Sequence, residues 1–168
     1  MIKAIAQRRG VFQLVHFTRV ENVESILDHG IKPVSQLIND NSTFIRNDNM
    51  RLDNHLDAIS MSISFPNFKT FYKMRMESKQ SEWAVLILKP EILWEKVCSF
   101  FPLNAADSRM RKKSSVHFRD PSSFEEMFST TYGDRENFLA DYDPTNSQAE
   151  VMVFETVGPD YIDAIAFQ

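Results

Sequence analysis

The most constraining feature of the sequence is a strict alternation of apolar residues and serine over residues 59–65, Ile-Ser-Met-Ser-Ile-Ser-Phe. A period of two predicts a β-strand with one apolar and one polar face. Because serine is small, the polar face suits the floor of a ligand cleft, but it equally suits a solvent-facing edge. Both interpretations stay open from this segment alone.

The remaining pattern predicts one α+β domain over residues 1–168. Further strands are predicted at 11–17, 83–88, 97–101, 150–157 and 161–167. Helices are predicted at 21–29, 68–79, 90–94 and 122–129. Capping boxes beginning at Thr18 and Ser122 mark two of the helix starts. Strands and helices do not alternate regularly, which favours α+β over a regular α/β sheet.

Composition narrows the class of protein. With 43% apolar and 12% aromatic residues, the chain can bury a core, which argues against disorder over the whole chain. The single cysteine, Cys98, excludes an internal disulfide and is expected to be buried. The sequence contains no apolar run long enough for a membrane span and no secretory signal, so we expect a soluble, cytoplasmic protein. The net charge of −4 argues against a general nucleic-acid coat protein but allows a local basic groove.

Two clusters combine polar groups near strand ends. His16 closes the first predicted strand just before a helix start, where free backbone N–H groups bind anions; a hydrogen-bonded core histidine is the alternative. Gln148 and Glu150 share one side of a strand if strand pairing already holds there. The carboxylate can then hold a ribose hydroxyl and offset positive charge on a sugar carbon. A solvated strand start is the alternative.

A long polar loop is predicted over residues 39–57. Arg51 in this loop can pair with a diphosphate through its planar guanidinium, although a surface arginine is the alternative. The acidic and histidine residues of the loop match no standard spacing of metal ligands, so no metal is expected.

A basic, irregular segment is predicted over residues 103–121. Its charged and aromatic members are Arg109, Arg111, Lys112, Lys113, His117, Phe118 and Arg119. Positive charge interleaved with an aromatic ring can hold a nucleic-acid single strand, and a solvated loop is the alternative.

Together these residues resemble the DarT family, whose members ADP-ribosylate bases in DNA. The resemblance spans roughly residues 11–165. It is carried by His16-Phe17-Thr18 with Asn22 and Gly30, by Arg51-Leu52-Asp53, by Ser60-Met61-Ser62 with the segment 68–72, and by Gln148-Ala149-Glu150-Val151.

The resemblance implies a compact ADP-ribosyltransferase fold, in which two mainly antiparallel sheets with flanking helices form an NAD⁺ cleft. It implies that Glu150 is the catalytic glutamate and that Arg51 acts in NAD⁺ binding and catalysis. The other NAD⁺ contacts that it implies are His16 and Thr18 near nicotinamide and its ribose, Asn22 and Gly30 on the adenosine side, and Tyr72 stacked on nicotinamide.

The resemblance also bears on the acceptor. Gln148 corresponds to an acceptor-recognition position of the wider superfamily and disfavours arginine, which leaves thymine or guanine of single-stranded DNA as the expected acceptor. Arg109, Arg111 and Lys112 are the expected DNA contacts. We expect a monomeric toxin restrained by a macrodomain antitoxin. The alternatives are an enzyme of the same fold acting on RNA or protein, and a nucleic-acid-binding module without catalysis.

Overall fold

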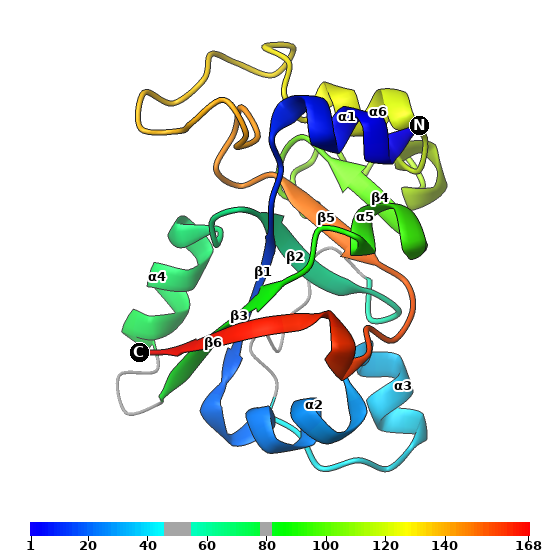
Figure 1. Ribbon diagram of the computed structural model, residues 1–168, viewed down its shortest axis with the longest axis vertical. Helices are drawn as coiled ribbons and strands as arrows, with labels where there is room; N and C mark the ends of the chain where they lie inside the picture. Colours follow the sequence, from blue (N-terminus) through cyan, green and yellow to red (C-terminus); the bar gives the residue numbers. More distant parts are fainter. Residues whose placement is uncertain (46–54, 78–81) are drawn as a thin grey trace.

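The computed structural model describes residues 1–45, 55–77 and 82–168 (Figure 1). Within these ranges six strands form one antiparallel sheet in the order β4-β5-β2-β1-β3-β6. The strands are β1 (Leu14–Arg19), β2 (Ile59–Ile63), β3 (Trp83–Leu88), β4 (Cys98–Phe101), β5 (Glu150–Val153) and β6 (Ile162–Phe167). The helices are α1 (Ile2–Arg9), α2 (Val23–His29), α3 (Val34–Asn39), α4 (Phe68–Glu77), α5 (Ile92–Glu95) and α6 (Pro121–Glu126). Short 3₁₀ turns are η1 (Val20–Asn22), η2 (Ser115–Phe118) and η3 (Pro159–Tyr161). The predicted α+β class is confirmed.

The sheet has a narrow join at its middle. β1 and β2 pair only through Leu14–Ile63 and Val15–Ser62, whereas β1 and β3 pair along the whole of β1. Beyond the join β2 and β5 run away from β1 at an angle (Figure 1). The two sheets expected from the resemblance are therefore one sheet, in which β6-β3-β1 and β2-β5-β4 form two halves.

Apolar side chains cover both faces of this sheet. Ile59, Met61 and Ile63 of β2 join the largest core cluster, which also includes residues of α1, α5 and α6. On the opposite face, α4 covers a cluster around Trp83, and the segment after β4 covers another around Phe101. The periodicity over 59–65 therefore predicted the strand and its apolar face correctly.

The serine face of β2 is enclosed rather than solvated. Ser62 and Ser64 are 7% and 8% exposed, and β2 lies between β1 and β5. The solvent-facing edge that the sequence left open is therefore wrong, because strands distant in sequence pair with both sides of β2.

The first predicted capping box is wrong. Thr18 is a buried strand residue that pairs with Ala84 of β3. The chain then turns through η1, and α2 begins only at Val23 without a side-chain cap. Long-range strand pairing here outweighs the local capping preference. The predicted stop at His29 and Gly30 is confirmed.

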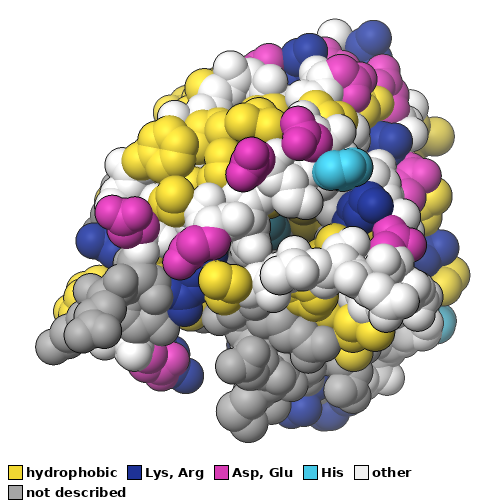
Figure 2. All heavy atoms as spheres, turned by 90° about the horizontal axis from the view of Figure 1, so that it is seen from below, with side chains coloured by type: hydrophobic (Ala, Val, Ile, Leu, Met, Phe, Trp, Pro, Cys, Tyr) yellow, Lys and Arg dark blue, Asp and Glu magenta, His cyan; other side chains and the backbone are white. Residues whose placement is uncertain are grey.

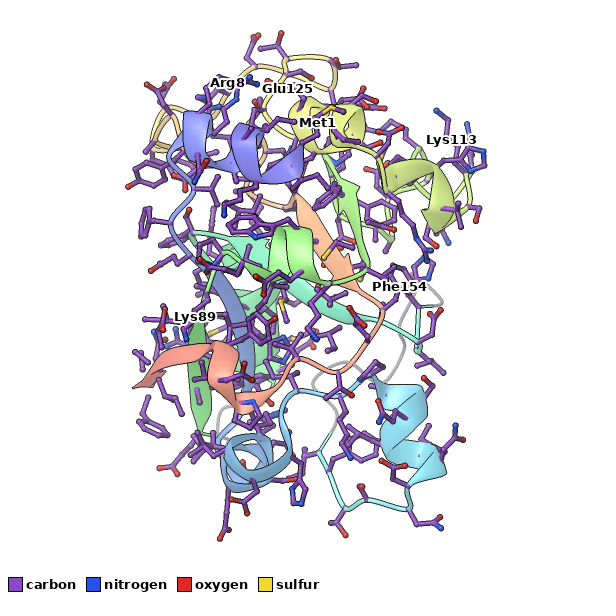
Figure 3. All side chains as sticks on the ribbon, turned by 45° about the vertical axis from the view of Figure 1, so that its right-hand side comes forward. Met1, Arg8, Lys89, Lys113, Glu125 and Phe154 are labelled. Atoms are coloured by element: carbon purple, nitrogen blue, oxygen red, sulfur yellow. The ribbon has the colours of Figure 1, made fainter. Side chains whose placement is uncertain are left out.

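The second capping box is also displaced. Helix α6 begins at Pro121, and Asp120 is its cap, because the Asp120 carboxylate accepts a hydrogen bond from the Ser123 backbone N–H at 2.7 Å. Glu125 instead pairs with Arg8 and Arg9 and so ties α6 to α1, as Figure 3 shows for Arg8. The sequence did not predict helices α1 and α3.

The aromatic residues of α4 point in different directions. Phe71 is buried and stacks on Phe17 at 4.8 Å between ring centroids, whereas Tyr72 is 62% exposed. Adjacent helical residues project about 100° apart, so only one of them can face the sheet.

Cys98 is buried in β4, as expected. Burial, with a smaller effect from the negative charge of Glu155, raises the pKa of the Cys98 thiol to about 12. The thiol therefore stays protonated and acts as a small hydrophobic group. Within the described ranges, no helix has the length and hydrophobicity needed to cross a membrane.

We predict that Gly30→Ala destabilises the fold far more than Gly10→Ala. Gly30 has φ 79° and ψ 177°, and an added Cβ would lie 2.4 Å from the carbonyl oxygen of Val157. Gly10 also has a positive φ, 72°, but its added Cβ would make only ordinary contact with Tyr142 at 3.9 Å. Urea unfolding should show a loss of about 3 kcal/mol or more for Gly30→Ala and about 1 kcal/mol for Gly10→Ala. Equal losses would mean that the Val157 contact is unimportant.

Candidate active site

Glu150 is the first residue of β5 and is only 9% exposed. One carboxylate oxygen, Oε1, accepts a hydrogen bond from the Ser60 hydroxyl at 2.8 Å. The other, Oε2, accepts one from the Ala105 backbone N–H at 2.7 Å. Donors on both oxygens fix the plane of the carboxylate. Glu150 is thus a positioned acceptor rather than a solvated strand start.

His16 lies where β1 and β2 separate. Its Nδ1 is 2.8 Å from the Ser60 carbonyl oxygen. A carbonyl can only accept, so Nδ1 carries the proton, and in the neutral ring Nε2 is an acceptor. If the pairing of β1 with β2 continued in register, Phe17 would lie opposite Ser60. Instead, the Ser60 carbonyl oxygen binds the His16 imidazole, and the backbone ladder does not continue. The ring therefore lies where the backbone ladder between the two strands ends.

Ser60 joins these two side chains. Its carbonyl oxygen binds His16, and its hydroxyl binds Glu150. Three neighbouring strands, β1, β2 and β5, thereby supply one connected polar group. The sequence signal for Ser60 was the serine alternation, whereas Ala105 gave no signal because it contributes a backbone N–H.

Thr18 in β1 and Asn22 in η1 follow His16 along the chain. The Asn22 amide donates to the Thr18 hydroxyl at 3.1 Å and to the Ile45 carbonyl at 2.8 Å, and its oxygen accepts from the Ile45 N–H at 2.9 Å. Asn22 therefore anchors the backbone at Ile45. A contact of Asn22 with adenosine stays a prediction, as does one of Gly30, whose close approach to Val157 already requires glycine.

The described residues do not include Arg51, so its predicted role lies outside them. Tyr72 is exposed on α4. Helix α4 packs on the cluster that contains Val15, and Val15 pairs with Ser62 of β2. Paired residues share a face of a sheet, so α4 covers the face that carries the serines of β2. Glu150 binds Ser60 on this face, and Tyr72 therefore belongs to a helix on the same face as Ser60 and Glu150.

Gln148 does not lie in a strand. β5 begins at Glu150, so the condition for the two side chains to share a strand face is not met. Instead, the Asn146 side chain accepts from the Gln148 N–H at 2.8 Å, and the Asn146 carbonyl accepts from the Ala149 N–H at 3.0 Å. This turn, typical of asparagine, sets the approach of the chain to Glu150.

The basic segment has a mixed structure. The Arg109 guanidinium binds both carboxylate oxygens of Asp107, at 2.9 and 2.8 Å, and hydrogen bonds from the Arg109 side chain and backbone lower the pKa of Asp107 to about 2. Arg111, Lys112 and Lys113 are exposed, and Figure 3 shows Lys113 at the periphery of the molecule.

Phe118 cannot serve as an exposed stacking ring. It is 4% exposed and packs on Phe101 at 4.5 Å between centroids. That part of the nucleic-acid prediction is wrong, because the core cluster under this segment takes up the ring. Nearby, the Arg119 guanidinium lies 4.7 Å from the ring of Phe154, just beyond β5 (Figure 3).

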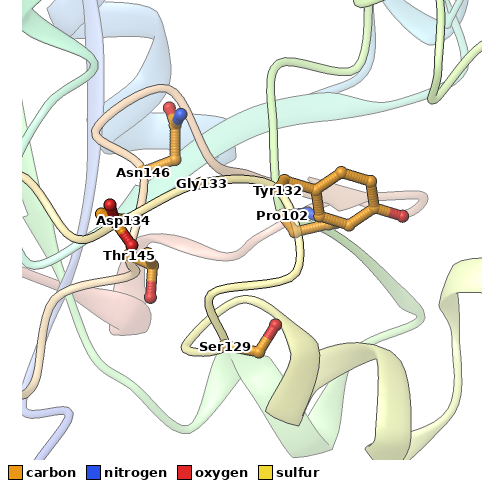
Figure 4. Close-up of a pocket in the computed structure, with 7 residues that line it drawn as sticks. All are labelled: Pro102, Ser129, Tyr132, Gly133, Asp134, Thr145 and Asn146. Carbon is orange, nitrogen blue, oxygen red and sulfur yellow. The ribbon is translucent and has the colours of Figure 1, made fainter.

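Other parts of the described surface carry weaker signs of a binding site. At the α2–α3 end, acidic and basic side chains are interspersed with hydrophobic ones (Figure 2). A cavity of about 20 Å³ between Pro102, Tyr132 and Thr145 holds at most one water and lies beside the 130–146 loop rather than at Glu150 (Figure 4). In the part of the chain that the structure describes, no group of three or more His, Cys, Asp or Glu side chains could hold a metal ion.

Comparison with known proteins matches residues 15–168 to the family model DarT, described as ssDNA thymidine ADP-ribosyltransferase. Among solved structures, the chain is similar to Thermosipho africanus DarTG in complex with ADP-ribose, with a TM-score of 0.56 and 18% sequence identity. The similarity covers 92% of this chain and 43% of that chain, so this chain spans less than half of that protein's length. No curated protein matches. The structural likeness supports the fold, and because the family match covers nearly the whole sequence, the chain belongs to the DarT family of ssDNA thymidine ADP-ribosyltransferases.

Proposed function

We propose that this chain transfers ADP-ribose from NAD⁺ to a thymine base of single-stranded DNA, with Glu150 as its catalytic carboxylate. The observation that carries this proposal is the pair of hydrogen bonds that holds the Glu150 carboxylate in one connected polar group with Ser60 and His16. The family description favours thymine over guanine, and over RNA or protein as acceptor.

In this reaction the bond between nicotinamide and the ribose C1′ breaks, and nicotinamide leaves with the electron pair. A nitrogen of the base forms the new bond to C1′ and releases its proton. The transition state resembles an oxocarbenium ion, as in glycoside hydrolysis. Glu150 would accept a hydrogen bond from a ribose hydroxyl and offset the positive charge that develops on the sugar.

Further groups would bind NAD⁺. His16 with its Nε2 acceptor and Thr18 would contact the nicotinamide ribose, Asn22 and Gly30 the adenosine side, and Tyr72 the nicotinamide ring. Arg51 would bind the diphosphate. The similar DarTG structure contains ADP-ribose, the group that NAD⁺ donates, which supports NAD⁺ as co-substrate.

For the acceptor side, Gln148 would orient the base, and Arg109, Arg111 and Lys112 would contact DNA phosphates. Because Arg109 is bound to Asp107, Arg111 and Lys112 are the stronger candidates. We further propose that the activity is toxic, that the enzyme acts as a cytoplasmic monomer, and that a macrodomain antitoxin reverses the mark.

Glu150→Gln should abolish transfer while leaving the fold intact. The amide keeps the volume of the side chain but loses the negative charge and one acceptor oxygen. We expect the transfer rate to fall by about 10²- to 10³-fold, measured as nicotinamide release and by mass spectrometry of an oligonucleotide. Circular dichroism melting serves as the control for folding, and full activity in a folded Glu150→Gln protein would refute the assignment.

Ser60→Ala should lower kcat by about 10-fold with little change in KM, because it frees one oxygen of Glu150 while the backbone bond to His16 remains. Ser60→Thr keeps the hydroxyl and should retain most of the activity. Ser62→Ala is the matched control, since the Ser62 hydroxyl on the same strand face accepts from the Asn67 N–H at 3.2 Å. Equal effects of Ser60→Ala and Ser62→Ala would contradict a positioning role for Ser60.

The acceptor is tested with NAD⁺ and oligonucleotides of one base each. We expect an added mass of ADP-ribose on single-stranded oligo-dT and none on oligo-dG, on RNA or on the protein itself. Duplex DNA should react poorly, because pairing and stacking hide the base. Modification of protein or RNA alone would support the alternative acceptors, and absence of nicotinamide release under all conditions would support a module without catalysis.

A further inference from the structure

Three phenylalanines form a partly exposed cluster, here called the aromatic ridge: Phe65, Phe68 and Phe138. The Phe65 and Phe68 rings are 6.3 Å apart between centroids, and the Phe68 and Phe138 rings are 5.5 Å apart, both in edge-to-face geometry. Phe65 is 53% exposed and Phe138 63%. Exposed large apolar side chains that lie in contact mark an interaction site more often than single ones do.

The aromatic ridge begins three residues beyond the position of β2 that the register places opposite Glu150. β2 and β5 pair through Ser60–Met152, so the next positions in register bring Ser62 opposite Glu150. Phe65 follows Ser62 by three residues and stands just past the end of β2. The ridge therefore begins on the side of Glu150 where the loop that ends in Gln148 enters β5.

A second link fastens the loop to α4. The Glu136 carboxylate accepts from the Lys69 ammonium at 2.8 Å and from the Ser147 N–H at 3.2 Å. Partial burial opposes ionisation, but the hydrogen bonds from Lys69 and Ser147 outweigh it and lower the pKa of Glu136. This ionised bridge holds the start of α4 against the residues that precede Gln148.

The loop presents Phe138 in a defined position. The Arg135 guanidinium donates to the carbonyls of Ala140 and Asp143 at 2.7 and 2.8 Å. The Asp143 carboxylate accepts from the Ala140 N–H at 2.8 Å. These bonds close the chain on both sides of Phe138, so its ring projects from a folded turn. Figure 1 shows this loop and α4 on the same side of the molecule.

Positive charge accompanies the ridge. Lys69 and Lys73 are one helical turn apart on α4, with side chains 46% and 75% exposed. The Lys69 ammonium binds Glu136 at 2.8 Å, whereas the Lys73 ammonium is 3.9 Å from Glu77, so Lys73 is the stronger candidate for a phosphate contact. Aromatic faces next to lysines are the combination that binds a single strand without sequence preference, because bases stack on the rings and phosphates meet the ammonium groups. A protein partner would not require cations in this arrangement.

We propose that the aromatic ridge stacks a base of the single-stranded DNA neighbouring the base that is modified, with Phe138 as the principal stacking ring. This inference rests on the proposed function and names its DNA-holding surface. It replaces the basic segment 103–121 as the source of stacking, since Phe118 there is buried. A stacked neighbour would splay the strand so that the next base reaches Glu150.

The test compares Phe138 variants by fluorescence anisotropy of a labelled oligo-dT, and by transfer to it in the presence of NAD⁺. Phe138→Ala should weaken DNA binding by about 5- to 150-fold and raise the KM for DNA. Phe138→Trp should restore binding, whereas Phe138→Leu, which is apolar without a π face, should not. Nicotinamide release with water as acceptor should remain unchanged in all three variants.

Phe167→Ala is the matched control, because Phe167 is also a phenylalanine that is 63% exposed, but it lies on the edge strand β6. Its DNA affinity should equal that of the original chain. Unchanged affinity in Phe138→Ala, or equal rescue by leucine and tryptophan, would overturn the proposal, the latter result indicating a protein-binding apolar patch. Failure of the proposed function is distinguishable, because the original chain itself would then neither release nicotinamide nor modify DNA.

Discussion

The short pairing between β1 and β2 is the constraint on which the rest of the structure depends. Two residue pairs form the backbone ladder between the two halves of the sheet. Beyond them, His16 binds the Ser60 carbonyl oxygen with its ring instead of continuing the ladder with its backbone. Beyond these pairs, a side chain rather than the backbone ladder connects the two strands. The candidate site therefore exists because strand pairing stops at one residue, where a side chain satisfies the polar group that the ladder leaves behind.

Burial of Glu150 follows from the same arrangement. A carboxylate that is 9% exposed is costly unless hydrogen bonds compensate its lost hydration. Ser60 provides one donor from β2, and Ala105 provides another from the segment that follows β4, the strand on the other edge of β5. The basic segment thus has a structural role: its buried Phe118 and Met110 hold it on the sheet, so that the Ala105 N–H points at the carboxylate.

The proposed acceptor side of the site is held by side-chain hydrogen bonds and an ion pair rather than by strand pairing. Loop 130–146 has no strand or helix, yet Arg135 and Asp143 close it by side-chain to backbone hydrogen bonds, and Glu136 ties it to α4. Such a loop keeps its shape with little hydrophobic burial, so aromatic rings such as Phe138 can remain exposed. In the proposed function, the NAD⁺ side is built on strands and the DNA side on a loop that hydrogen bonds fasten.

Local patterns predicted the elements whose side chains repeat with a strict period. The alternation over 59–65 identified β2, and the apolar run at 83–88 identified β3 with its correct bounds. The two capping boxes failed for different reasons. Thr18 pairs with a strand more than sixty residues away in sequence, a contact that a local pattern does not contain. Asp120 replaces Ser122 because the local pair Asp120-Pro121 starts the helix two residues earlier than a Ser122 cap would.

The sequence by itself determined the α+β class, the family to which the chain belongs and the polar residues that could form a site, because each depends on residue types and their order. Only the tertiary structure decided that Ser60 connects His16 to Glu150, that Phe118 is buried while Phe138 is exposed, and that Gly30 must lack a side chain beside Val157. These facts depend on which distant strands meet and in what register. A local pattern fixes which face of a strand is apolar, but it does not say which distant strand lies beside it.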